Sequence, residues 1–111
     1  MASAAEASPV AQALQRVGAA TKAAWATGDA SAALANAVPY MQAFGHLVIA
    51  WIWLDVLLTV PAQAEQRSAA QVGRVHAARY FFHYELPKIP AWLAVVETRD
   101  PTCATMPEEA F

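Results

Sequence analysis

The feature that most constrains the fold is the apolar stretch from Phe44 to Val60, in which Asp55 is the one residue with a full charge at neutral pH. Large apolar side chains recur there on every side of a helix with 3.6 residues per turn. A helix that is apolar all round belongs in the middle of a protein or in a membrane. The sequence therefore predicts an all-α fold with a central, fully apolar second helix that other protein covers.

Residues that start and stop helices divide the first half of the chain. Ser8 and Pro9 predict the start of the first helix, because serine is a good cap and proline fits the first helical position. Gly28 predicts the end of this helix, and Asp29 or Ser31 is expected to cap the helix that follows. Pro39 predicts that the second helix is kinked or is divided into a short and a long piece.

The second half contains two further expected helices. Ser68 and Gln71 have the spacing of a capping box, which predicts a third helix that stops before Pro87. Pro87 and Pro90 predict a tight corner before a short last helix. The pattern as a whole predicts an up-and-down bundle of about four helices. The expected parts are a flexible N-terminus over 1–8, a helical bundle domain over 9–98 and an extended C-terminal tail over 99–111.

Composition limits the partners that the chain can have. Hydrophobic residues make up 58% and charged residues 14%, against roughly half and a quarter in ordinary globular domains. This excess predicts either that part of the apolar surface meets a partner or that the chain lies in a membrane. The seven Lys and Arg residues are scattered and the net charge is −2, so no basic patch for nucleic acid is expected. Cys103 is the single cysteine, which favours a reducing, cytoplasmic setting.

Three blocks of sequence carry a family resemblance. The first is Leu-Ala-Asn-Ala-Val-Pro-Tyr-Met over 34–41, followed by Gly45 and by Ile-Ala-Trp over 49–51. The second is Ala-Ala-Arg-Tyr-Phe-Phe over 77–82 with Glu-Leu-Pro over 85–87, and the third is Arg-Asp-Pro-Thr-Cys over 99–103, near the terminal Phe111. In this order and spacing they resemble the C-terminal helical domain of the acyl-CoA dehydrogenase family, in its methylmercaptopropionyl-CoA dehydrogenase-like long form.

The resemblance implies a non-catalytic module that serves packing or oligomerisation. Full-length enzymes of this family are oxidoreductases of fatty acid metabolism that pass a hydride from an acyl-CoA thioester to FAD, after a glutamate removes the α proton. Those parts lie upstream of the module. No catalytic, cofactor-binding or metal-binding role is therefore carried over to any residue, and no cofactor is expected in this chain. The expected partners are upstream dehydrogenase domains or further copies of the chain. For the isolated chain the composition favours a homodimer, because the second helix has more apolar faces than three short neighbours can cover.

Four polar residues are candidates for a structural role, namely Asp55, Arg79, His46 and His83. A buried carboxylate without a partner is costly, so Asp55 is expected to have one. The favoured interpretation is an ion pair or hydrogen bond with Arg79, a histidine or a tyrosine of the third helix. An acid or base role for Asp55 in a pocket is the alternative.

His46, His76 and His83 raise the possibility of a metal site. His76 and His83 lie two helical turns apart, about 10.5 Å along the axis, which is too far for two ligands on one zinc without a third element. His46, His76 and His83 are therefore expected to be surface residues or hydrogen-bonded core residues.

Large and small side chains both give expectations about packing. The aromatic residues are expected in the core, because a small bundle needs large side chains to fill it. Gly45 and Gly73 are expected to mark close helix crossings. The aromatic set is Trp25, Tyr40, Trp51, Trp53, Tyr80, Tyr84 and Trp92.

Two alternatives to a packing module stay open. Phe44–Val60 is just long enough to span a membrane, but Asp55 would then cost about 3 kcal/mol inside the hydrocarbon, so no membrane contact is expected. The other alternative is a stand-alone bundle that binds a small apolar or acyl ligand, which a cavity of roughly 300 Å³ or more would favour. The sequence shows no nucleophile–base pair or phosphate loop that would suggest a self-sufficient enzyme.

Overall fold

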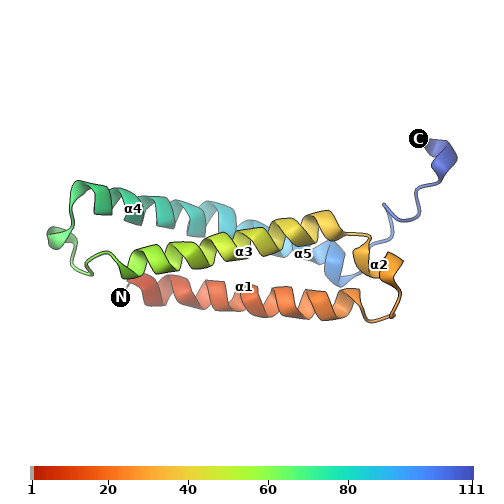
Figure 1. The fold of residues 1–111 in the computed structure, drawn as a ribbon, viewed down its shortest axis with the longest axis horizontal. Helices are drawn as coiled ribbons and strands as arrows, with labels where there is room; N and C mark the ends of the chain where they lie inside the picture. The colour runs from red at the N-terminus through yellow and green to blue at the C-terminus, as the bar shows by residue number, and fades with distance from the viewer. Residues whose placement is uncertain (1) are drawn as a thin grey trace.

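The computed structural model describes residues 2–111, with side chains from Glu6 onward, and contains helices and turns but no strand in that range. The α-helices are α1 (Ala2–Ala24), α2 (Ala30–Leu34), α3 (Ala37–Leu58), α4 (Ala69–Tyr80) and α5 (Ile89–Glu97). Helix α1, helix α3 and the run from α4 to α5 alternate in direction (Figure 1). Helix α5 packs against both α1 and α3, whereas α4 packs mainly against α3. The predicted all-α, up-and-down bundle is confirmed.

The first helix begins earlier than predicted. Helix α1 already starts at Ala2 and contains Pro9 in its interior, so the prediction that residues 2–8 precede the first helix is wrong. Alanine is the strongest helix former and is abundant before Pro9. Met1, which belongs to the same predicted segment, lies outside the described residues.

The turn between α1 and α3 has the predicted residues in their predicted roles. Gly28 follows α1 with a φ of +72°, in the left-handed region that glycine adopts without strain. The Asp29 carboxylate accepts a hydrogen bond from the Ser31 backbone N–H at 3.1 Å and caps the short α2. Pro39 lies in the first turn of α3, where its missing N–H is tolerated. It therefore divides the segment into a short and a long helix.

The start of α4 is as predicted, but the corner that follows it is absent. Ser68 Oγ accepts from the Gln71 N–H at 3.2 Å, and Gln71 Oε1 accepts from the Ser68 N–H at 2.9 Å, which completes the capping box. The run from α4 to α5, which contains Pro87 and Pro90, continues in nearly the same direction (Figure 1). A π-helical turn over Phe81–Glu85 and a 3₁₀ turn over Leu86–Lys88 link α4 to α5. Each proline opens a new helical segment, so neither has to break one.

Alanines rather than glycines mark the close helix contacts. Ala20, Ala43, Ala50 and Ala78 are completely buried where the helices meet. A Cβ added to Gly45 or Gly73 would meet nothing within 4 Å, so the prediction that these glycines mark helix crossings is wrong. The larger core residues are Val10, Val17, Leu47, Leu57, Val75, Phe81, Phe82, Leu86, Ile89, Leu93 and Val96.

Helix α3 lies in the middle of the bundle, but it is not covered on every side. It contacts α1, α4 and α5, and it buries Ala43, Leu47, Ala50 and Leu57. The opposite side is open to solvent, with Trp51 64% exposed. The prediction that protein surrounds this helix is therefore wrong for a single chain, because three neighbours on one side cannot enclose it.

The aromatic residues divide in the same way. Tyr40, Trp53 and Trp92 are partly buried and pack against the core. Trp25, Trp51, Tyr80 and Tyr84 are about half exposed or more, so the prediction that they fill the core is wrong for these four. The bundle is narrow, and its alanine-lined contacts leave little interior volume for large rings.

The end of α5 is tied to the end of α1 and to the start of α3, which lie at the same end of the bundle (Figure 1). Asn36 Nδ2 donates to the Val95 and Asp100 carbonyl oxygens at 3.2 and 3.0 Å. Arg99, which has a φ of +51°, donates from its guanidinium to the Ala23 carbonyl at 2.7 Å. Beyond it, residues 101–111 are exposed and lead away from the helices (Figure 1), with a 3₁₀ turn over Glu108–Ala110.

Candidate functional site

The outstanding surface feature is a row of exposed apolar side chains on α1 and α3. Spacings of three, four and seven residues place the α3 members on one side of that helix. We call this surface the α1–α3 face. It consists of Leu14, Met41, Phe44, Val48, Trp51 and Ile52, which are 38–64% exposed. Monomeric proteins seldom leave so many large apolar side chains together in water, so this face is the main candidate for an interaction.

A groove runs along this face between the antiparallel helices α1 and α3. Its volume is about 370 Å³. Every lining residue is apolar, and Leu14 and Trp51 at its rim are more than 60% exposed. The groove can therefore accept apolar side chains of a protein or an acyl chain, and the indole N–H of Trp51 is the one side-chain donor among its lining residues. The lining residues are Ala7, Val10, Ala11, Leu14, Phe44, Leu47, Val48, Trp51 and Leu54.

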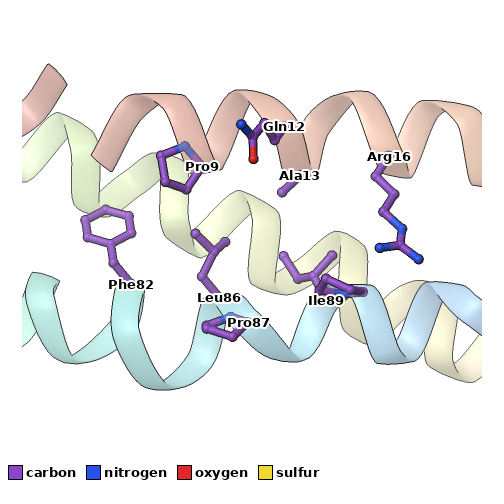
Figure 2. Close-up of a pocket in the computed structure, with 9 residues that line it drawn as sticks. Pro9, Gln12, Ala13, Arg16, Phe82, Leu86, Pro87 and Ile89 are labelled. Carbon is purple, nitrogen blue, oxygen red and sulfur yellow. The ribbon is translucent and has the colours of Figure 1, made fainter. Parts of the chain in front are cut away.

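A second, smaller groove lies on the other side of α1. Figure 2 shows Pro9, Gln12 and Arg16 of α1 across from Phe82 and Leu86, and the groove has a volume of about 280 Å³. The Arg16 guanidinium at its edge is already engaged. It donates from Nε and Nη2 to the two Glu97 carboxylate oxygens at 2.7 and 3.2 Å. This pair ties α1 to the end of α5 and leaves the groove without a free charge for a ligand.

One polar cluster joins α3 to the π-helical turn. His46 Nε2 lies 3.1 Å from Glu85 Oε1, and Lys88 Nζ donates to Glu85 Oε2 at 2.7 Å. The His46 and Trp92 rings also form a T-shaped pair, with ring centroids 4.7 Å apart. Hydrogen bonds from Lys88 and, next, His46 hold the pKa of Glu85 below its ordinary value. The cluster links α3, the π turn and α5, which is a structural task.

The predicted site residues do not come together. His46 is partly buried and hydrogen-bonded, which agrees with the expectation of a hydrogen-bonded core residue rather than a surface one. Asp55, Arg79 and His83 are exposed. Asp55 has no hydrogen-bond or ion-pair partner in the described part of the chain, so the expected pairing with Arg79 or another residue of the third helix is not found. The open side of α3 lets water solvate this carboxylate, which therefore needs no protein partner.

No arrangement for metal chemistry is seen in the described residues. Among residues 2–111, no three His, Cys, Asp or Glu side chains lie together as metal ligands would. His76 is exposed, as is the thiol of Cys103 in the tail.

By length and composition, α3 could also cross a membrane, and among the described helices it is the one that meets this criterion. The core helices of many proteins meet the same criterion. Asp55 lies on the exposed side of α3 within this span, where hydrocarbon would have to cover its carboxylate.

The geometry defines a small helical module whose distinctive feature is an apolar face rather than a pocket with polar groups. In a comparison with known families, residues 1–107 match the family described as acetyl-CoA dehydrogenase C-terminal like. The chain belongs to this family. No curated protein and no solved structure matched the chain.

Proposed function

We propose that this chain is a non-catalytic C-terminal helical module of an acyl-CoA dehydrogenase-like flavoprotein. Its task is to bury the α1–α3 face against other protein and so to hold an assembly together. The observation that carries this proposal is the exposure of the six large apolar side chains of that face. Their burial would contribute roughly 25 cal/mol for each Å² removed from water.

The described residues do not fit FAD. The larger groove has only apolar walls, whereas a dinucleotide needs donors and positive charge around its diphosphate. The smaller groove offers Gln12 and an arginine that Glu97 already occupies. We therefore derive no step of the reaction through this chain. In the proposed assembly, the remaining domains of a long-form enzyme bind the flavin and the acyl-CoA substrate of fatty acid metabolism. The proposed location of this assembly is the cytoplasm.

A second candidate function is the binding of a small apolar or acyl ligand. The groove volume of about 370 Å³ favours it, because ligand sites begin at roughly 300 Å³. Such sites also enclose most of the ligand, and two helices form only one wall. Titration with a fatty acid, followed through tryptophan fluorescence, tests this candidate. A saturable change that Trp51→Leu removes would place it ahead of packing.

The proposal is tested with the purified chain in two measurements. The preparation is expected to be colourless and unable to oxidise acyl-CoA thioesters with an added electron acceptor. A yellow, active preparation would overturn the non-catalytic assignment. Substitution Trp51→Lys on the face is expected to weaken association, either with itself or with the dehydrogenase domains of a family member. Tyr84→Lys, at an equally exposed aromatic residue outside the face, is the matched control. Equal effects of the two substitutions would contradict the role of the face.

A further inference from the structure

We infer that the α1–α3 face binds the same face of a second copy of this chain, with the two α3 helices antiparallel about a two-fold axis near Val48. This inference rests on the proposed function and names the partner of that surface. In such a dimer the two α1–α3 hairpins would form a four-helix core, and each contact would occur twice.

The size of the face suits a homodimer. The six side chains expose on the order of 650 Å², which exceeds the apolar patch of a typical monomer and approaches the roughly 800 Å² that each partner of a stable interface buries. A two-fold axis places each copy's apolar row against an equally apolar row. A second copy of the chain can therefore cover this face without a partner of another type.

Charge at the two ends of the face fixes the direction of the pairing. Lys22 lies three turns after Ala11 and so on the same side of α1, which borders the groove. The Thr21 and Tyr40 hydroxyls are 2.8 Å apart, which sets Lys22 beside the start of α3. Asp55 lies on the exposed side of α3, about 22 Å further along that helix. An antiparallel pairing brings each Asp55 to the partner's Lys22, whereas a parallel one sets like charges together.

Gly45 gives an independent indication. A glycine inside a helix costs about 1 kcal/mol relative to alanine, and nothing in the chain lies where the Cβ of Gly45 would be. Packing inside the chain thus gives no reason for this glycine. With the axis at Val48, Gly45 lies opposite the partner's Ile52, and Phe44 lies opposite the partner's Trp51. The missing side chain then makes room for a neighbour outside the chain.

Cysteine crosslinking tests the position of the axis in the full chain with Cys103→Ser. Val48→Cys is expected to form a covalent dimer under mild oxidation, because the two thiols meet at the axis. Asp55→Cys is the matched control, since its two copies would lie about 21 Å apart along the helices. A covalent dimer with Asp55→Cys but not with Val48→Cys would overturn the antiparallel arrangement.

Charge exchange tests the direction of the pairing, with the dimer fraction as readout. Asp55→Lys and Lys22→Glu are each expected to weaken the dimer severalfold, and the double variant is expected to restore it. Because Asp55 and Lys22 are both exposed, the fold should tolerate these substitutions. Circular dichroism checks that each variant keeps its helix content. If the dimer fraction is the same in all three variants as in the wild type, the inferred register is overturned but the proposed function is not. A monomer that binds dehydrogenase domains does the same. A monomer that floats with phosphatidylcholine vesicles overturns both.

Discussion

The His46 ring in α3 lies 3.1 Å from the carboxylate of Glu85 in the π-helical turn, and Lys88 holds the other oxygen of that carboxylate. A π turn adds one residue to a helical turn, which changes the side-chain directions beyond it. Here it sets Glu85 between α3 and the start of α5. The turn that replaces the predicted corner therefore also locks three segments together.

This contact predicts an acid-sensitive step in stability. Because Lys88 and His46 lower the pKa of Glu85 in the folded chain, the carboxylate stabilises the fold fully above its ordinary pKa of 4.5, and this contribution is lost as the pH falls through the lowered value. Thermal unfolding of wild type and Glu85→Gln measured against pH should show curves that converge on acidification. Parallel curves would mean that Glu85 contributes no pH dependence.

The pair between Arg16 and Glu97 gives a prediction of small magnitude. The side chains of Arg16 and Glu97 are 42% and 31% exposed, so solvent screens the interaction despite its two hydrogen bonds. A double-mutant cycle with Arg16→Ala and Glu97→Ala should give a coupling free energy of about 0.5–1 kcal/mol. Coupling above about 2 kcal/mol would show that the pair is far more shielded than the structure indicates.

Two leucines should differ sharply in their contribution to the fold. Leu93 is completely buried between α5 and its neighbours, whereas Leu34 in α2 is 60% exposed. Leu93→Ala should lower the free energy of unfolding by about 2–5 kcal/mol, because it leaves a cavity. Leu34→Ala should lower it by less than about 1 kcal/mol. Denaturant unfolding measures both, and similar losses would contradict the placement of α5 in the core.

The amide of Asn36 should be required in its exact chemical form. Asn36→Ala removes both hydrogen bonds to the end of α5 and should cost about 1–2 kcal/mol. Asn36→Asp keeps the shape but turns an acceptor toward two carbonyl oxygens, so it should cost more. An aspartate variant as stable as wild type in denaturant would show that the amide does not hold α5.

Local sequence signals predicted the local structure well. The capping box at Ser68 and Gln71, the cap at Asp29 and the division at Pro39 all depend on neighbours within one helical turn, so the chain encodes them directly. The prediction of a tight corner at Pro87 and Pro90 is wrong because a proline can either stop a helix or start one. Only the conformation of the next turn distinguishes the two cases. Glu85 and Lys88 have the spacing of a helical ion pair, a signal that the sequence did offer.

The exposed face of α3 could not be located from the sequence. A helix with apolar residues on every side has no polar side to mark its direction, so its rotation in the bundle is set by the helices that pack against it. The contact between His46 and Glu85 spans 39 positions of the chain, beyond the range of any local pattern. The prediction of a buried, paired Asp55 is wrong for the same reason, because no polar side of the helix marks which residues face solvent.

The central claim is that protein covers the α1–α3 face, and the molar mass of the wild-type chain in solution tests it most directly. Light scattering over a wide range of concentration should show the mass rising from that of the 11.9 kDa chain toward twice that value and levelling there. A constant monomer mass at every concentration, in a chain that stays soluble and binds no other protein, would contradict the account.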